Sequence, residues 1–120
     1  MITGVEVVFI HTPDPQLADW YEDVLGLSRI YDDGKWIEFT SQGVTRFALD
    51  VTAENPSPVE KQAFMVCLRV DDINKEVERL SGKGVQFYPD REHTIFDVGA
   101  NLVATFQDPQ GNWLQLSQCK

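Results

Sequence analysis

The sequence predicts an α+β fold made of two tandem βαβββ modules, and an internal repeat is the main reason. In each copy, an alternating apolar strand runs into an Asp, an amphipathic segment follows, and a Gly comes twelve residues after that Asp. The copies lie 58 positions apart in a chain of 120 residues, the length of one domain. The repeated residues are Val8, Ile10, Asp14, Gly26 and Leu27, which return as Val66, Leu68, Asp72, Gly84 and Val85. Two half-domains are therefore expected, with function in a cleft between them.

The first module, about residues 1–52, opens with a strand and a helix. Residues 5–12 are β-branched and aromatic, and Pro13 ends the strand because proline cannot donate to a ladder. Asp14 is a favourable N-cap with Pro15 at the first helical position. Gly26 is expected to end the helix in a left-handed conformation.

Three strands should complete the first module. They are predicted at residues 27–31, 35–40 and 44–51, with turns at Asp33-Gly34 and at Ser41-Gln42-Gly43. The segment that follows, about residues 53–63, is polar, contains prolines and lacks periodicity. It is expected to connect the modules.

The second module, about residues 64–120, should repeat the same order. A strand over residues 64–70 leads to Asp72, the predicted N-cap of a helix that ends at Gly82 and Gly84. Three strands are predicted at residues 85–88, 101–106 and 113–117, with an irregular, charged stretch at 89–98 and a turn at 108–112.

Composition excludes several classes of partner. The 19 acidic and 10 basic residues give a formal net charge of −9 without a Lys/Arg cluster, so nucleic acid is not an expected partner. No targeting segment begins the sequence, and no uncharged stretch approaches the roughly 20 residues that span a bilayer. Two cysteines without a disulfide framework agree with a cytoplasmic location, and Cys67 is expected to be buried in its strand.

Two local motifs, together with the element order, resemble a known family. Residues 20–27 (WYEDVLGL) close the first helix, and residues 108–112 (DPQGN) precede the last strand. In this arrangement the chain resembles the vicinal oxygen chelate superfamily, which contains glyoxalases, bleomycin-resistance proteins and extradiol dioxygenases. The resemblance covers essentially residues 1–120, and it implies one glyoxalase-like domain with a U-shaped mixed sheet around a cavity and helices on the outer face. One fold of this kind hosts many activities.

The resemblance also implies where metal ligands would lie. Metal-dependent members carry a His on the first strand and a Glu on the last strand of each module. These positions fall here on Val7, Met65, Asp50 and Gln115, or on Glu6 in place of Val7 if the helix sets the register. Such side chains cannot supply the three or four donors that a divalent ion needs. The sequence therefore predicts no metal at the usual site and no other cofactor.

Strand alternation indicates which side chains line the predicted cavity. Apolar residues such as Phe47, Leu49, Leu114 and Leu116 should face the helices, which leaves the alternate positions on the other face. The candidate ligand-binding residues on that face are Phe9, Trp36, Glu38, Arg46, Asp50, Arg69, Thr105, Trp113 and Gln115. Aromatic walls with a few polar groups are typical of a small-molecule pocket.

Several of these residues have a structural alternative. Trp36 and Trp113 are as well suited to a dimer interface as to ligand stacking. Arg46 and Arg69 are expected to pair with Glu38 or Asp50, although a ligand carboxylate or phenolate between them is the other option.

His11 is the candidate acid or base, because histidine titrates near neutrality. Its alternative is a histidine hydrogen-bonded at a strand end. His93 is expected to be exposed and structural, and Trp20 and Tyr21 should belong to the core.

Three functional hypotheses follow. The first is a metal-free small-molecule-binding protein, a homodimer resembling members that sequester aromatic or glycopeptide antibiotics; the acidic balance would suit a cationic ligand. The second is a lyase, isomerase or dioxygenase with a displaced divalent-metal site at His11, Glu38 and Asp50. The third is an interaction module without a ligand. Whether the protein is an enzyme is left open by the sequence.

Overall fold

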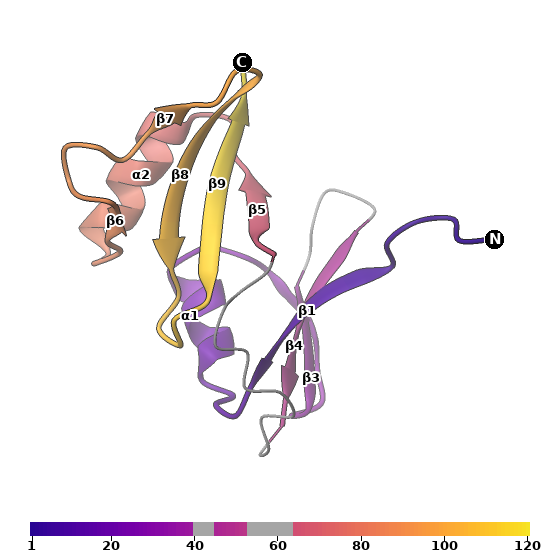
Figure 1. Cartoon of the computed structure of the whole chain (residues 1–120). Helices are drawn as coiled ribbons and strands as arrows, with labels where there is room; N and C mark the ends of the chain where they lie inside the picture. Colours follow the sequence, from indigo (N-terminus) through magenta and orange to yellow (C-terminus); the bar gives the residue numbers. More distant parts are fainter. Residues whose placement is uncertain (40–44, 53–63) are drawn as a thin grey trace. The chain divides into compact units, whose positions relative to one another are not determined.

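The structure is a computed structural model that describes residues 1–39, 45–52 and 64–120. The described residues form two helices and nine strands in two mixed sheets, which confirms the α+β class. The chain divides into two compact units, Met1–Pro58 and Val59–Lys120, here called unit 1 and unit 2. Figure 1 shows the helix and the sheet that each unit contains.

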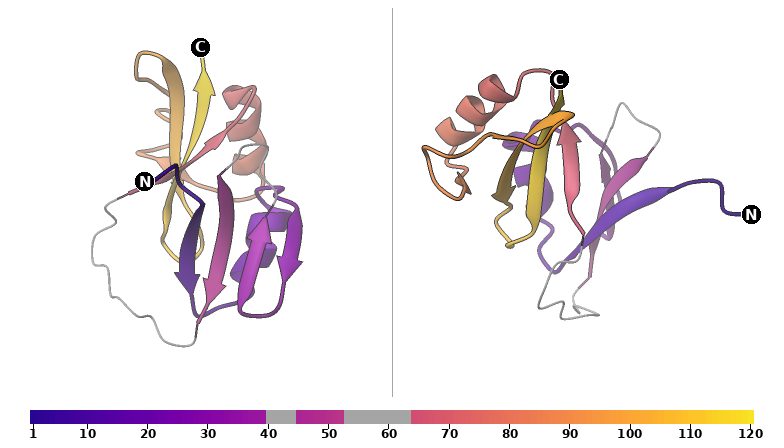
Figure 2. Two further views of the ribbon diagram at one scale, coloured as in Figure 1. Left: turned by 90° about the vertical axis from the view of Figure 1, so that its right-hand side faces the viewer. Right: turned by 45° about the horizontal axis from the view of Figure 1, so that its top comes forward.

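Unit 1 contains one helix and a four-stranded sheet. Its elements are β1 (Val7–Thr12), α1 (Leu17–Asp23), β2 (Arg29–Asp32), β3 (Trp36–Phe39) and β4 (Arg46–Val51). The strand order is β1-β4-β3-β2, with β1 and β4 parallel and the other pairs antiparallel. The left view of Figure 2 shows these strands side by side with α1 behind them. The predicted βαβββ order is therefore confirmed for this module.

The core of unit 1 lies between α1 and one face of its sheet. Tyr21 of α1 is fully buried, and its ring centroid lies 5.9 Å from that of Phe39 and 5.4 Å from that of Phe47. Ile37 and Leu49 are buried on the same face. The alternation predicted for β4 is thus correct, and the side chains at alternate positions lie on the sheet face that α1 leaves uncovered.

The start of α1 differs from the prediction, whereas its end agrees. The helix begins at Leu17, and Gln16, not Asp14, occupies the N-cap position. Asp14 acts one turn earlier, because its Oδ1 accepts the backbone N–H of Gln16 at 2.9 Å and so stabilises a tight turn before the helix. Gly26 follows the helix with a φ of +79°, as predicted.

Unit 2 repeats this plan with one additional short strand. Its elements are β5 (Val66–Arg69), α2 (Ile73–Gly82), β6 (Phe87–Tyr88), β7 (Phe96–Asp97), β8 (Asn101–Gln107) and β9 (Trp113–Cys119). The strands follow the order β5-β9-β8-β6, with β5 and β9 parallel and β7 paired to β8. The prediction that residues 89–98 are irregular throughout was wrong at β7, because two residues are too few to show an alternating pattern.

Helix α2 covers one face of the unit 2 sheet. Ile73 and Leu80 of α2 are fully buried together with Phe106 and Leu114. The predicted cap is confirmed, since Asp72 accepts the backbone N–H of Lys75 at 3.2 Å. The side-chain oxygen of Gln118 on β9 accepts the N–H of Ile73 at 2.7 Å, which joins the helix start to the sheet.

Three predictions have different outcomes. The turn at 41–43, the strand residues Thr40 and Val44, and the connection at 53–63 lie outside the described residues. The predicted burial of Cys67 was wrong, because its thiol is exposed on the face of the unit 2 sheet opposite α2. The U-shaped arrangement around a cavity remains a prediction.

Candidate functional site

The uncovered sheet face of unit 1 carries the candidate residues of the first module. We call this set the unit 1 face: Phe9, His11, Trp36, Glu38, Arg46 and Asp50. The ring of Phe9 lies at its centre, with its centroid 5.4 Å from that of His11 and 5.2 Å from that of Trp36. Phe9 is 39% exposed although it is a large apolar side chain. An exposed aromatic ring of this kind indicates a surface able to bind something apolar.

His11 and Asp50 contact each other on this face. The parallel register of β1 and β4 sets the two residues opposite each other, and His11 Nδ1 lies 2.8 Å from Asp50 Oδ2. This contact agrees with the alternative of a histidine hydrogen-bonded at a strand end. A histidine held by a carboxylate can still transfer a proton from its free nitrogen, so the role of His11 as an acid or base stays a prediction.

Arg46 is held by two carboxylates at the other end of the unit 1 face. Its guanidinium donates to Glu38 Oε1 at 3.0 Å and to Glu6 Oε1 at 3.1 Å. Trp36 Nε1 donates to the same Glu38 oxygen at 3.2 Å, and the Glu38 side chain is only 14% exposed. The expected pairing of Arg46 with Glu38 is thus confirmed, and it satisfies a carboxylate that would be costly to bury alone.

These contacts bear on the displaced metal site. Of its three proposed ligands, Glu38 is bound to Arg46 and Trp36, and Asp50 is bound to His11. Among the residues that the structure describes, no three His, Cys, Asp or Glu side chains lie close enough together to hold an ion. His11, Glu38 and Asp50 therefore do not converge on one point as a ligand set must.

The unit 2 sheet presents a corresponding face with different chemistry. We call this set the unit 2 face: Cys67, Arg69, Thr105, Trp113, Gln115 and Ser117. At its centre, Cys67 Sγ donates to Gln115 Oε1 at 3.3 Å, and Gln115 Nε2 donates to Thr105 Oγ1 at 3.1 Å. This chain of neutral hydrogen bonds crosses β5, β9 and β8.

The two ends of the unit 2 face differ from its centre. At one end, the rings of Trp113 and Tyr88 meet edge to face with centroids 4.5 Å apart. At the other end, Arg69 lies opposite Ser117, whose hydroxyl accepts the side-chain N–H of Asn101 at 2.8 Å. Arg69 is exposed and makes no ion pair with the described residues of unit 2. Its expected partners Glu38 and Asp50 belong to unit 1, so that pairing stays a prediction.

Two residues that contact the unit 2 face were not predicted from the sequence. Tyr88 joins Trp113 because β6 pairs with β8 in a register that sets Tyr88 opposite Thr105. Asn101 supports Ser117 across β8 and β9. Parity within each strand could have placed both on this face, but their partners depend on a strand register that the sequence does not display.

The registers also show which positions of the two faces correspond. Phe9 lies opposite Ala48, and Cys67, 58 positions after Phe9, lies opposite Gln115. Ala48 is therefore the counterpart of Gln115, whereas Ser117 is the counterpart of Asp50. Asp50 and Gln115, the two carboxylate positions inferred from the resemblance, are not equivalent in the two sheets.

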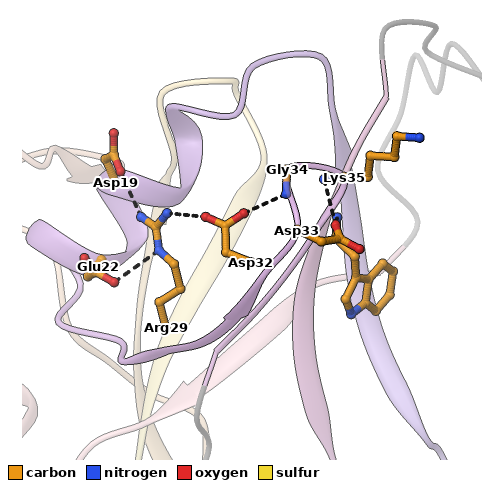
Figure 3. A network of polar contacts seen from close by, with 8 residues as sticks. Asp19, Glu22, Arg29, Asp32, Asp33, Gly34 and Lys35 are labelled. Carbon is orange, nitrogen blue, oxygen red and sulfur yellow. Dashed lines mark hydrogen bonds and ion pairs between the residues drawn. The ribbon is translucent and has the colours of Figure 1, made fainter.

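A second charged cluster in unit 1 fixes α1 to β2 (Figure 3). Arg29 donates to Asp19 at 2.8 Å, to Asp32 at 2.8 Å and to Glu22 at 3.2 Å. The hydrogen bonds to Asp19 and Asp32 raise the pKa of the guanidinium above its ordinary value, and the N–H of Gly34 lowers the pKa of Asp32. Every group in this cluster is satisfied within the unit, which indicates a structural role.

His93 and Asp108 also have local structural roles. His93 is exposed and lies 2.9 Å from Asp90, as expected for a structural histidine, and this contact lowers the pKa of Asp90. Asp108 is 4% exposed and accepts the N–H groups of Gln110 and Asn112 at 2.9 Å each. This carboxylate explains why the 108–112 motif forms a defined turn.

Comparison with known proteins identifies the family. The model of the glyoxalase/bleomycin resistance protein/dioxygenase superfamily matches residues 7–116. The chain belongs to this superfamily, which confirms the resemblance carried by the two sequence motifs. No protein of curated function matches the sequence. Within the described residues, no helix is long and apolar enough to cross a membrane.

Solved structures share the fold over nearly the whole chain. TnmS3, an antibiotic binding protein from Streptomyces sp. CB03234, is 24% identical, with 99% of this chain and 98% of that chain covered and a TM-score of 0.76. A putative glyoxalase family protein from Bacillus anthracis is 17% identical, with 100% and 98% covered and a TM-score of 0.75. A superfamily member from Sphaerobacter thermophilus DSM 20745 is 26% identical, with 98% of each chain covered and a TM-score of 0.70.

Proposed function

We propose that this protein binds and sequesters a polar aromatic small molecule without a metal ion. The observation that carries the proposal is the state of the unit 1 face, where Glu38 is already paired with Arg46 and Asp50 with His11 while the ring of Phe9 stays exposed. Carboxylates held by protein partners are poor metal ligands, because binding a metal would break those contacts. Exposed rings beside fixed polar groups suit an aromatic ligand.

The proposal assigns the candidate residues to two roles. The aromatic residues supply stacking surface, and the polar residues orient the ligand or hold one another in place. The binding residues of the proposal are Phe9, Trp36, Glu38, Arg46, Asp50, Arg69, Thr105, Trp113 and Gln115, with His11 as the one candidate for proton transfer. Sequestration needs no reacting group, so it is compatible with a histidine that is already paired.

The comparisons support this proposal at the level of the family. The superfamily includes the bleomycin-resistance proteins. TnmS3, which has the same fold, is an antibiotic binding protein. A cytoplasmic homodimer is part of the proposal. The acidic net charge of −9 adds long-range attraction for cations without defining the ligand.

Two measurements on one preparation test the proposal. Protein purified without chelators is first analysed for Zn, Ni, Mn and Fe, and less than a tenth of an equivalent of each is expected. The same protein is then screened by thermal shift against bleomycin and a panel of planar aromatic antibiotics. A true ligand at a hundredfold excess over its dissociation constant should stabilise the fold by about 2.7 kcal/mol.

Variants make the result specific. Phe9→Ala and Trp36→Leu should reduce the thermal shift, whereas Ile30→Ala, an exposed apolar residue of β2 outside the unit 1 face, should leave it unchanged. A stoichiometric metal that is lost in His11→Ala would overturn the proposal in favour of a lyase, isomerase or dioxygenase. A panel without any hit would overturn it in favour of an interaction module.

A further inference from the structure

We propose that the ligand carries an acidic group at one end of an elongated aromatic body, and that Arg69 on the unit 2 face binds that group. This inference rests on the proposed function and narrows its ligand class. It departs from the expectation of a cationic ligand that net charge alone suggests. The residues that support it lie in unit 2, where the arginine of the face differs from that of unit 1 in its contacts.

Arg69, unlike Arg46, has donors that can bind a ligand. Arg46 has its guanidinium occupied by Glu6 and Glu38 of its own unit, whereas Arg69 has no carboxylate partner among the described residues of unit 2. Arg69 is also the one charged member of the unit 2 face as defined above. A guanidinium presents five donors in a planar fork that matches a carboxylate or a phenolate. An unpaired fork therefore favours an anion over a cation at this end of the face.

The second step is the distance between this charge and the aromatic pair. Arg69 lies opposite Ser117, and Trp113 lies four residues before Ser117 on the same face of β9. At a strand rise of about 3.3 Å per residue, the two ends are about 13 Å apart. A single ring would reach only one of them. A ligand that uses both must be elongated, with its rings against Trp113 and Tyr88 and its acid at Arg69.

The third step is the neutral strip between the two ends. Cys67, Gln115 and Thr105 bind one another in a chain, and none of them carries a charge. The strip can therefore lie under an uncharged aromatic body without leaving a buried ion unpaired. The side-chain amide of Gln115 keeps one N–H and one oxygen lone pair, which can bind a polar substituent of the ligand. This agrees with a polar aromatic compound.

A charge series of one scaffold tests the inference. Biphenyl-4-carboxylate, biphenyl-4-methanol and biphenyl-4-methylamine have the same rings and differ in charge. Calorimetric titration should show the carboxylate binding about tenfold tighter than the alcohol, because a charge-assisted hydrogen bond contributes more than a neutral one. The amine should bind most weakly.

The variant Arg69→Gln should reduce the affinity for the carboxylate about tenfold and change the affinity for the alcohol by less than about twofold. The matched control is Arg91→Gln, which removes the same charge from an exposed arginine of unit 2 that lies outside the face. It should leave all three affinities unchanged. The wild-type series tests the charge preference even if a variant fails to fold.

Two outcomes would overturn the inference alone. They are equal binding of carboxylate and alcohol by the wild type, and equal effects of Arg69→Gln and Arg91→Gln. In both, the biphenyl scaffold still binds, so the proposed function stands. Absence of binding by all three biphenyls also overturns the inference, and the antibiotic panel then decides the proposed function separately.

Discussion

The two sheet faces share one backbone plan and differ in how their polar groups are satisfied. In each unit the first strand pairs in parallel with the last, so His11 and Arg69 occupy corresponding positions opposite Asp50 and Ser117. On the unit 1 face, His11 contacts the carboxylate of Asp50 and Arg46 is bound to that of Glu38. On the unit 2 face the hydrogen bonds are neutral, and the cation has no ion-pair partner among the described residues of that unit.

This difference shows that the duplicated fold fixes positions but not chemistry. A charged side chain that is paired with its neighbour is already satisfied by that neighbour, so it contributes little to ligand binding. A charge without a partner retains its capacity to bind. We therefore expect unit 1 to contribute aromatic surface and a fixed electrostatic background, and unit 2 to contribute the selectivity for ligand charge.

The largest effect should come from the buried turn of unit 2. Asp108→Ala removes a buried acceptor of two backbone N–H groups and should lower the free energy of unfolding by about 2–3 kcal/mol. The matched variant in unit 1 is Asp33→Ala, because Asp33 also accepts two backbone N–H groups but is exposed, so its loss should be smaller. Urea denaturation measures both, and equal losses would contradict the contrast in burial.

Double-mutant cycles should give different coupling free energies for the pair His11 and Asp50 and for the corresponding pair Arg69 and Ser117. His11→Gln and Asp50→Asn should show a coupling free energy of about 0.5–1 kcal/mol, the range of a partly exposed polar contact. Arg69→Gln and Ser117→Ala, at the corresponding positions, should be additive within error. Coupling of the second pair as strong as that of the first would show that Arg69 is not free.

Single replacements of the two arginines should follow the same contrast. Arg46→Gln leaves Glu38 without its cation and should cost about 0.5 kcal/mol, a cost that high salt reduces. Arg69→Gln should leave the free energy of unfolding unchanged, because no ion pair with a described residue of unit 2 is lost. Denaturation in low salt and in 0.5 M NaCl tests this prediction, since the ionic strength then changes on the order of tenfold. A loss of stability in Arg69→Gln as large as that in Arg46→Gln would argue against an unpaired arginine.

The smallest effect concerns two exposed carboxylates. The N–H of Trp36 lowers the pKa of Asp33, whereas the side chain of His93 is the main cause of the lowered pKa of Asp90. His93→Asn should therefore raise the pKa of Asp90 toward its ordinary value and leave that of Asp33 lowered. Because both folded pKa values are depressed, the associated stability is present above the ordinary value of 3.8 and is lost as the pH falls through the folded pKa. Carboxyl NMR titration measures both groups, and an unchanged Asp90 would contradict the assignment.

Patterns within single segments allowed much of the fold to be predicted. Alternation placed Phe47, Leu49, Leu114 and Leu116 in the core, and the N-cap at Asp72 and the left-handed Gly26 followed from local chemistry. The start of α1 was missed because Asp14 stabilises a turn with the same residue type that caps a helix. Strand β7 was too short to leave a pattern.

The candidate residues were predicted by parity, but their partners were not. Strand parity assigned His11, Asp50, Glu38 and Arg46 to one face, and only the register of β1, β3 and β4 shows which of them pair. Register depends on long-range packing and cannot be derived from one strand alone. The pairing of Arg69 with Glu38 or Asp50 stays a prediction, because these residues belong to different units.

Calorimetric titration of biphenyl-4-carboxylate, with and without EDTA, tests the central claim most directly. The claim is that the protein's own side chains bind an aromatic compound without a metal ion, with Arg69 holding its acid. We predict the same dissociation constant in both conditions and about a tenfold weaker one for Arg69→Gln in both. Binding that disappears with EDTA and returns with an added divalent ion would contradict the account.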